Sequence, residues 1–477
     1  MPSFACDPLA PSTPLNHVWS HTIGSNHALM TLRADWQTQM RRARADLHVQ
    51  YVRFHGVLDD DMAVLLDEQD KLLYGFRNVD IVFDFLREIG MKPFVELSFM
   101  PSTLASGSQT VFNYRGNITP PRDPQAWCTL IDQFVRHCIE RYGLAEVKTW
   151  FFEVWNEPNL DAFWTGGQAG YFDLYKITAN TIKAIDPGLR VGGPATANDE
   201  WIPEFIDFCR AGNIACDFVT THHYPTDALG KPGDDTEQQL ALATRDVLKH
   251  RTEQACREAG ELPVYYTEWS TTSNPFFDQH DDPYAAAFVA KNFLDVDHLV
   301  KAYSYWTFSD IFEENYFSSL PFHGGFGLLT VNDVPKPSYR AVQLLARLGR
   351  ERLALAGDHA TVNVTAARSP DGTLIALCTN HAFPRHPIAS ETLELTIRSA
   401  ADPVAVFVER IDEEHANAKR SWQVMGSPLH PSIDQVRRLR SASELQVEPM
   451  GWRRSGGDVV VAFELPAHAV AAVTLRF

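Results

Sequence analysis

Eight short strand-like runs, each followed by a longer segment of helical period, make up the first two thirds of the sequence. The runs are too apolar to face water on one side, which is typical of buried parallel strands. The strand-like runs are HVWSHTIG (17–24), VQYVRFHG (49–56), KPFVELSF (92–99), KTWFFEVW (148–155), LRVGG (189–193), DFVTTHHY (217–224), LPVYYTEW (262–269) and KAYSYWTF (301–308). The helical segments are predicted near 31–46, 79–90, 124–142, 168–185, 201–211, 236–260, 283–300 and 336–350.

This alternation predicts a closed (β/α)8 TIM barrel of the α/β class over residues 14–348, with catalytic groups at the carboxyl ends of its strands. A doubly wound sheet is the alternative. It would require a Gly-rich phosphate loop after the first strand, and ThrIleGlySerAsnHis (22–27) is not such a loop.

After about Leu348 the hydrophobic period changes from 3.6 to 2. Alternating runs such as ATVNVTAAR (360–368), TLIALCTN (373–380) and ETLELTIRS (391–399) are separated by turn signals such as ProAspGly (370–372). We therefore predict a C-terminal antiparallel β-sandwich over residues 349–477 as a second, accessory domain.

The charge balance disfavours phosphate-rich partners. The chain has 42 Lys and Arg against 60 Asp and Glu, a formal charge of −18, and no run of Lys or Arg is longer than two residues. Nucleic acids and anionic membranes are bound through basic faces, so we expect neither as a partner.

Targeting signals and cysteines bear on the compartment. The segment MPSFACDPLAPSTPLNHVW has no basic region followed by an apolar stretch of signal-peptide length, and no run of about 18 apolar residues occurs. We expect a cytoplasmic protein. The seven cysteines are scattered and never form a CxxC pair, so we expect neither a disulfide framework nor structural zinc, and no cofactor or metal.

Two carboxylates at strand ends carry the strongest functional signal. Glu157, in TrpAsnGluPro, follows the fourth run, and Glu268, in TyrTyrThrGluTrp, lies at the end of the seventh. Either one alone would more often be a solvated or salt-bridged loop residue. Together they suit glycoside cleavage, in which one carboxyl protonates the leaving oxygen while the other attacks or stabilises the anomeric carbon.

Short motifs at the strand ends point to a family. They are PheGluValTrpAsnGluPro (152–158), ThrGluTrp (267–269), HisHisTyrPro (222–225) and PheHisGly (54–56). With these motifs the chain resembles glycoside hydrolase family 39 of clan A, which contains β-xylosidases and α-L-iduronidases. The runs ValArgPheHisGlyValLeuAspAspAsp (52–61) and PheValGluLeuSerPheMetPro (94–101) are similar to the β-xylosidase members.

The resemblance covers nearly the whole chain and implies a retaining, exo-acting β-D-xylosidase that releases xylose from short xylo-oligosaccharides. It implies that Glu157 is the general acid/base and that Glu268 is the nucleophile. For retention, we expect the two carboxyl groups to lie about 5–5.5 Å apart, and we expect a raised pKa for Glu157. Residues 1–13 are expected to join the sandwich. Relatives are often homo-oligomers, and the sequence leaves the oligomeric state open.

The resemblance also implies substrate-binding groups. Asn156 would bond the sugar 2-hydroxyl, and His55, His222 and Tyr224 would line the glycone pocket, with Tyr224 donating to the nucleophile. Trp306 would form the floor on which the apolar face of the sugar stacks.

Further groups are expected around the pocket. Glu314, rather than Glu313, would reach the distal hydroxyls of the terminal xylose, and Tyr114 would border the leaving-group side. One residue departs from the β-xylosidase pattern, which usually has Gly before His55. Phe54 stands there instead and is expected to narrow the pocket floor or to alter the packing behind it.

Several alternatives stay open at this point. Iduronidase activity requires a cation for the uronate carboxylate, and the loop SerAspIlePheGluGluAsnTyrPhe (309–317) offers no Arg, so a neutral pentose is favoured. A β-galactosidase, a glucanase or a catalytically silent carbohydrate-binding protein are the others. The acidic rim expected to suit a cationic transition state consists of Glu157, Glu268, Asp310, Glu313 and Glu314.

Overall fold

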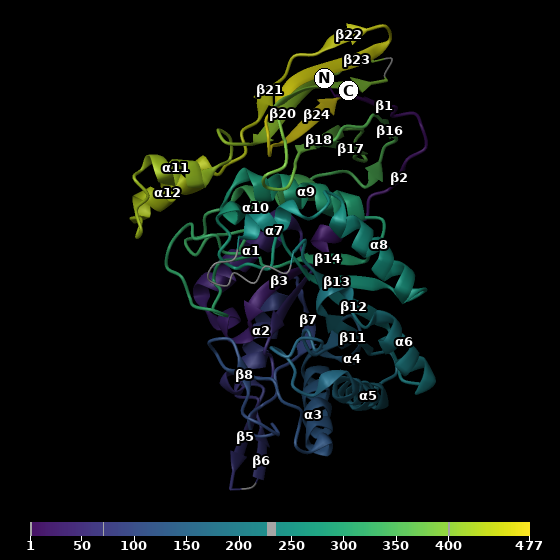
Figure 1. Ribbon diagram of the computed structural model, residues 1–477, viewed down its shortest axis with the longest axis vertical. Helices are drawn as coiled ribbons and strands as arrows, with labels where there is room; N and C mark the ends of the chain where they lie inside the picture. The colour runs from purple at the N-terminus through teal and green to yellow at the C-terminus, as the bar shows by residue number, and fades with distance from the viewer. Residues whose placement is uncertain (1, 70, 227–234, 399–400) are drawn as a thin grey trace.

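The computed structural model describes residues 2–69, 71–226, 235–398 and 401–477. Its central feature is a ring of eight parallel strands in the order β14-β13-β12-β11-β10-β7-β4-β3 (Figure 1). The predicted (β/α)8 barrel is therefore confirmed. The strands are β3 (Thr22–His27), β4 (Tyr51–His55), β7 (Lys92–Leu97), β10 (Phe151–Val154), β11 (Arg190–Thr196), β12 (Phe218–His223), β13 (Val264–Trp269) and β14 (Ala302–Tyr305).

The ring closes where β3 meets the end of β14. The Phe308 amide donates to the Gly24 carbonyl at 3.0 Å. A Cβ on Gly24 would lie 2.6 Å from the Trp306 ring and 2.8 Å from the Tyr305 carbonyl oxygen. Only glycine allows this close approach, so Gly24 both seals the barrel and leaves room for the Trp306 ring.

Helices cover the outside of the ring. The predicted segment 236–260 is divided into two helices, and the other helical predictions have counterparts. The helices are α1 (Ala34–Leu47), α2 (Arg77–Glu88), α3 (Pro124–Tyr142), α4 (Leu144–Val147), α5 (Gly167–Ile185), α6 (Ile202–Ala211), α7 (Thr236–Ala241), α8 (Val247–Ala259), α9 (Pro283–Val296) and α10 (Pro337–Ala346). Short 3-10 helices occur at Val18–Ser20, Ala28–Leu32, Asp60–Met62, Ala197–Asp199 and Asp278–Asp281.

The inside of the barrel is layered. Near the amino-terminal ends of the strands, an apolar cluster consists of Tyr51, Phe94, Phe151, Phe218, Tyr265 and Ala302. Side chains two positions further along a strand point to the same face. The next layer therefore contains Arg53, Glu96, Glu153 and Thr267, all buried. An apolar plug thus supports a polar layer directly beneath the carboxyl ends of the strands.

The C-terminal residues form two packed sheets at the upper end of Figure 1. One sheet consists of β16 (Leu355–Ala356), β1 (Ser3–Cys6), β19 (Glu391–Ile397), β23 (Asp458–Leu465) and β22 (Arg453–Ser455). The other consists of β2 (Thr13–Pro14), β15 (Glu351–Arg352), β17 (Val362–Arg368), β18 (Leu374–Asn380), β24 (Val470–Arg476), β20 (Ala405–Ile411) and β21 (Glu448–Pro449).

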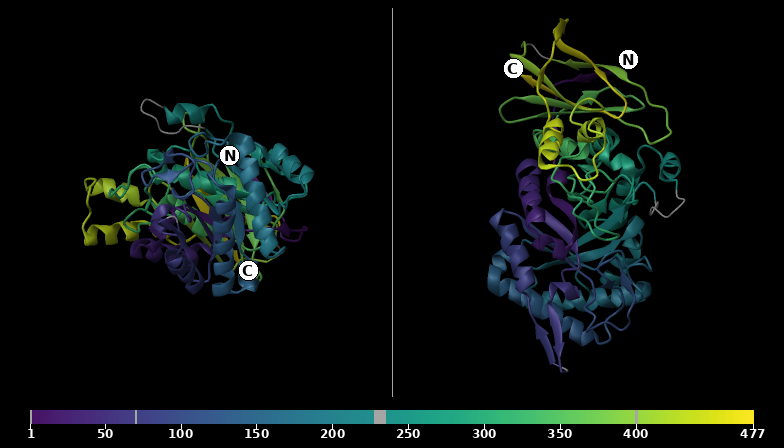
Figure 2. Two further views of the ribbon diagram at one scale, coloured as in Figure 1. Left: turned by 90° about the horizontal axis from the view of Figure 1, so that it is seen from below. Right: turned by 90° about the vertical axis from the view of Figure 1, so that its left-hand side faces the viewer.

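The pairing in both sheets is antiparallel with one exception among the described strands. Strand β1 lies parallel to β19, with Phe4 opposite Leu395. Strand β2 pairs with β15, so both amino-terminal strands belong to the C-terminal sheets. Helix α9 lies between the barrel and these sheets, and all its residues from Pro283 to Leu294 are buried (Figures 1 and 2).

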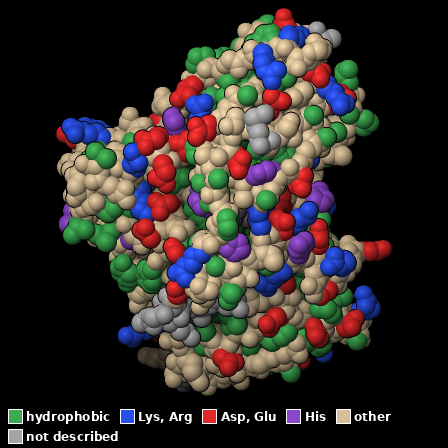
Figure 3. All heavy atoms as spheres, turned by 45° about the horizontal axis from the view of Figure 1, so that its top comes forward, with side chains coloured by type: hydrophobic (Ala, Val, Ile, Leu, Met, Phe, Trp, Pro, Cys, Tyr) green, Lys and Arg blue, Asp and Glu red, His purple; other side chains and the backbone are tan. Residues whose placement is uncertain are grey.

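Some elements have no counterpart in the sequence prediction. The hairpin of β5 (Leu65–Glu68) and β6 (Lys71–Tyr74) projects at the lower end of Figure 1, and β8 (Thr110–Val111) pairs with β9 (Gly116–Asn117). Helices α11 (Ala418–Val424) and α12 (Ile433–Ala442) lie between β20 and β21 in the chain. None of the described helices has the length and apolarity needed to cross a bilayer. On the face shown in Figure 3, basic side chains are scattered among acidic ones.

Candidate active site

A cavity of about 370 Å³ opens at the carboxyl ends of the barrel strands. It is lined by His55, Val111, Phe112, Asn156, Glu157, Leu160, Ala162, Phe163, Tyr224, Glu268, Ser273, Pro275, Trp306, Glu314, Asn315 and Phe326. A larger hollow of about 600 Å³ lies at the amino-terminal ends of the strands, but no described carboxylate lines it. Paired-acid chemistry therefore belongs to the first cavity.

Glu157 and Glu268 face each other in this cavity. An oxygen of each carboxyl group and a ring nitrogen of His222 all lie within 4.8 Å of one another. The two side chains are only 10% and 6% exposed. Glu268 lies within β13, whereas Glu157 follows β10 in a turn where its φ is +43° and that of Trp155 is +72°. Left-handed backbone at two non-glycine residues costs about 1–3 kcal/mol each, which the surrounding packing must offset.

Arg53 connects the buried acids beneath the cavity, and the sequence analysis missed it. Its Nη1 lies 2.6 Å from Glu268 and its Nε lies 2.6 Å from Glu153. Its Nη2 lies 2.8 Å from both Asn156 Oδ1 and Glu96. Burial alone would lower the pKa of Arg53, but Glu153, Glu96 and Glu268 raise it. The strand period contains the signal, because Arg53 has the same parity as His55 in ValArgPheHis.

Both oxygens of Glu268 accept hydrogen bonds. Oε1 accepts from Arg53, and Oε2 accepts from the Tyr224 hydroxyl at 3.1 Å. Burial raises the pKa of Glu268, while Arg53 and His55 oppose that shift. Asn156 uses its side-chain oxygen for Arg53, which leaves its NH2 group as a donor at the cavity wall.

Glu157 stands at the end of a hydrogen-bonded chain. Its Oε1 lies 3.0 Å from Nδ1 of His222, and Nε2 of His222 lies 3.0 Å from the Thr267 hydroxyl. That hydroxyl donates to Glu153 at 2.7 Å. Burial lowers the pKa of His222 well below its ordinary value, so its ring is neutral near pH 7. The sequence favours His222 over His223 because His222 shares parity with Tyr224, and His223 indeed faces away, bonding to Asp199 at 3.0 Å.

His55 and Glu314 complete the polar wall of the cavity. Nδ1 of His55 lies 2.8 Å from Glu96, and its Nε2 lies 3.5 Å from both Glu268 and Glu314. Burial lowers the pKa of His55 to about 3, so the ring is neutral. Burial, with the nearby charges of Glu268 and Glu157, raises the pKa of Glu314 well above its ordinary value. The His55 and Trp306 rings lie 4.7 Å apart, and both line the cavity.

Other expected residues lie elsewhere. Glu313 turns away from the cavity and lies 2.8 Å from Nδ1 of His27, and the Tyr114 ring stacks on His27 at 3.7 Å. Neither is among the residues that line the cavity. The expectation that Asp310 belongs to an acidic rim is wrong, because it is buried and paired with Lys336 at 2.7 Å.

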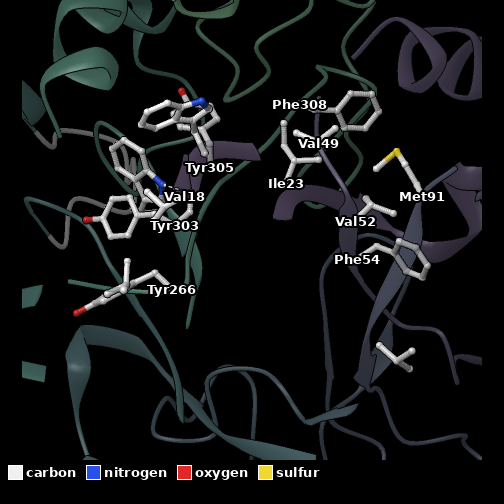
Figure 4. Packing of buried hydrophobic residues seen from close by; sticks show 14 of the residues in the cluster. Val18, Ile23, Val49, Val52, Phe54, Met91, Tyr266, Tyr303, Tyr305 and Phe308 are labelled. Atoms are coloured by element: carbon white, nitrogen blue, oxygen red, sulfur yellow. Dashed lines mark hydrogen bonds between the residues drawn. The ribbon is translucent and has the colours of Figure 1, made fainter. Parts of the chain in front are cut away.

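Phe54 packs behind the strand rather than into the cavity. It belongs to the hydrophobic core between the barrel and its helices, and Figure 4 shows it near Val52 and Met91. Its neighbours Arg53 and His55 point inward, so the strand period requires Phe54 to point outward. The second of the two expectations for this residue therefore agrees with the structure.

Comparison with known proteins gives a consistent result. Residues 4–459 match the model of the glycosyl hydrolases family 39. A β-xylosidase of Caldicellulosiruptor saccharolyticus is 47% identical over 468 residues, which cover 97% of this chain and 96% of the relative. A β-xylosidase of Geobacillus stearothermophilus is 36% identical, covering 93% of this chain and 89% of the relative.

Among solved structures, a monomeric β-xylosidase from Caulobacter crescentus superimposes with a TM-score of 0.87 at 33% identity, covering 100% of this chain and 99% of that one. Fold, motifs and full-length similarity agree, and this chain belongs to the glycosyl hydrolases family 39.

Proposed function

We propose that this chain is a retaining, exo-acting β-D-xylosidase, a xylan 1,4-β-xylosidase that releases xylose from the non-reducing end of short xylo-oligosaccharides. The observation that carries the proposal is the close approach of Glu157 and Glu268 with different partners on each. Similarity to two β-xylosidases over nearly the full chain supports the sugar. The cavity of about 370 Å³ is at the small end of ordinary ligand sites, which suits one terminal sugar.

Glu268 acts as the nucleophile. Arg53 and Tyr224 each donate to one of its oxygens, which fixes the carboxylate and stabilises its ionised form despite burial. The carboxylate attacks the anomeric carbon of the bound xylose and forms a covalent xylosyl-enzyme ester as the glycosidic bond breaks.

Glu157 acts as the general acid in the first step. The Thr267 hydroxyl gives its proton to Glu153, so it accepts from Nε2–H of the neutral His222. Nδ1 of His222 is then an acceptor, and Glu157 must supply the proton between them. This chain keeps Glu157 protonated until the leaving oxygen takes its proton.

In the second step Glu157 acts as the base. Formation of the ester removes the charge of Glu268, so the ionised Glu157 is no longer opposed by it. Glu157 takes a proton from water, which attacks the anomeric carbon from the side the leaving group occupied. The product keeps the β configuration, and the short separation of the two carboxyl groups supports this outcome.

The glycone contacts follow from the cavity wall. The Asn156 NH2 group is proposed to donate to the 2-hydroxyl, and Trp306 to stack on the apolar face of the sugar. His55, His222, Tyr224 and Glu314 surround the remaining hydroxyls. A protonated Glu314 is a hydrogen-bond donor to a distal hydroxyl, which is consistent with its raised pKa.

A uronate substrate fits this site poorly. No Lys or Arg is among the described residues that line the cavity, and Glu314 would repel a carboxylate. Each nitrogen of Arg53 is already engaged by an acid or by Asn156. The α-L-iduronidase alternative is therefore disfavoured.

The test is hydrolysis of xylobiose and xylotriose, followed by proton NMR in the first minutes. We expect β-xylose as the first product and no turnover by Glu268→Ala. Early α-xylose would exclude retention. Turnover equal to that of the Glu268→Ala control would leave a non-catalytic carbohydrate-binding protein, and faster cleavage of aryl β-galactoside or β-glucoside than of aryl β-xyloside would indicate a hexosidase.

A further inference from the structure

A histidine and three carboxylates meet beside the pocket, where β3 ends. His27 is fully buried, and its Nδ1 lies 2.8 Å from Glu313. On the other side of the ring, Nε2 lies 3.1 Å from Oδ2 of Asp59 and 3.4 Å from Oδ1 of Asp61. Asp59 and Asp61 belong to the AspAspAsp run at 59–61, for which the proposed reaction has no use.

Three atoms of this cluster lack hydrogen bonds. Nε2 of His27, Oδ2 of Asp59 and Oδ1 of Asp61 are all buried, and none has a hydrogen-bond partner within the described parts of the chain. The two oxygens are close to Nε2 but lie off the direction in which it would donate. Buried polar atoms are seldom left in this condition, and three that converge on one point indicate an occupant.

We propose that His27, Asp59 and Asp61 bind a divalent cation of the zinc type. Two ligand atoms each about 2.0–2.2 Å from a tetrahedral metal lie about 3.2–3.6 Å apart, close to the separations of 3.1 and 3.4 Å found here. Imidazole and carboxylate together suit zinc and its neighbours in the first transition row, and the two aspartates neutralise the charge of the ion.

Glu313 has the position of a supporting group. A histidine that binds a metal through one nitrogen usually donates its other N–H to a carboxylate, which fixes the tautomer. The 2.8 Å contact of Nδ1 with Glu313 has this arrangement and leaves the Nε2 lone pair toward the aspartates.

The surrounding backbone is shaped around the cluster. Gly56 has a φ of +71°, and a Cβ there would lie 2.3 Å from Oδ2 of Asp59 and 2.8 Å from the His27 ring. The Phe99 amide donates to Oδ1 of Asp59 at 2.9 Å, which leaves Oδ2 for the ion. The Asp61 side chain is 32% exposed and offers a path for the ion and for a water ligand.

A cation here would fix one wall of the sugar pocket. Asn26, next to His27, donates to Glu314 at 3.3 Å and accepts from the Glu313 amide at 3.1 Å. The ion would thus tie the Asp59–Asp61 turn to the segment that contains Glu314. Metal binding itself does not depend on the proposed reaction.

The experiment uses the full chain after dialysis against EDTA. Calorimetric titration with zinc is expected to give one tight site, and the melting temperature is expected to rise by about 3 °C at a hundredfold excess over Kd. Asp61→Asn should weaken binding at least tenfold. Asp60→Asn is the matched control, because Asp60 is exposed, accepts from the Ser102 amide at 3.0 Å, and keeps an oxygen acceptor as Asn.

A second pair of variants separates this site from the catalytic one. Glu157, His222 and Glu268 also lie close enough together to hold an ion. The proposal requires that Glu268→Ala retains the tight site and that His27→Gln loses it. It is overturned if chelator-treated protein binds no zinc, if Asp61→Asn binds as tightly as Asp60→Asn, or if Glu268→Ala is the variant that loses the site. Should Asp61→Asn fail to fold, cobalt(II) absorption of wild-type protein decides, since bands of a nitrogen- and oxygen-bound ion must appear in wild type and be absent from His27→Gln.

Discussion

The guanidinium of Arg53 lies 2.6 Å from the carboxylate of Glu268 in the middle of the barrel, with no exposed surface of its own. The same group also binds Glu153 and Glu96, so one cation serves three buried acids. The ionisation of the proposed nucleophile therefore depends on a residue that the substrate does not touch.

Replacing Arg53 should affect stability and catalysis differently. Arg53→Gln leaves buried acids without a counter-charge, so the free energy of unfolding should fall by about 3–5 kcal/mol. Arg53→Lys keeps the charge but cannot reach all three acids, and we expect partial recovery of stability with kcat reduced about a hundredfold. Urea unfolding and steady-state kinetics measure the two effects. Wild-type kcat in Arg53→Lys would contradict the positioning role.

The two catalytic glutamates should be distinguishable by leaving group. Glu268→Ala should lose activity on every substrate, by about 10⁴-fold or more. Glu157→Ala should lose most activity on xylobiose but retain the first step on an aryl xyloside with an acidic phenol, since a good leaving group needs no proton. Added azide should then give a β-xylosyl azide from Glu157→Ala. An α-azide would mean that the two roles are exchanged.

Thr267 is expected to matter for protonation of Glu157. Thr267→Val removes the acceptor of His222 Nε2–H, so kcat/KM on xylobiose should fall about tenfold, with little change on an activated aryl xyloside. Thr267→Ser keeps the hydroxyl and should restore the xylobiose rate. Equal losses on the two substrates would argue for a general packing defect instead.

Glu96 should give the protein a measurable pH dependence of stability. Burial raises the pKa of Glu96 to about 7, from an ordinary value of 4.5. Between these values the native state keeps a proton that the unfolded chain releases, so the free energy of unfolding falls as the pH rises. The difference in stability between wild type and Glu96→Gln should decrease by at most about 3 kcal/mol from pH 4.5 to 7. Chemical unfolding across this range provides the measurement, and an increase would have the wrong sign.

Much of the barrel could be predicted because its signals are local. Helix α3 has the predicted bounds, since Asp123 caps Gln125 at 2.9 Å, Pro124 begins the helix and Gly143 follows it. Glu157, Glu268, His55 and His222 come from different strands, yet barrel geometry alone brings the ends of those strands together.

The remainder depends on contacts that a linear pattern does not contain. Arg53 looks like any polar residue in an apolar run, and only three-dimensional closure reveals that three acids converge on it. Glu313 and Glu314 are neighbours in one loop, but their side chains diverge, one to His27 and the other to the cavity. The hairpin β5–β6 and the helices α11 and α12 are also short insertions with weak periodicity.

The pairing of Phe4 with Leu395 has a consequence for synthesis on the ribosome. The first strand emerges early, but the strands on which it docks are translated almost at the end. The barrel can therefore form while the leading segment still waits, exposed, for its partners. A short deletion at the beginning of the coding sequence should consequently injure the part of the protein that is made last, and leave the ring that carries out the chemistry nearly intact.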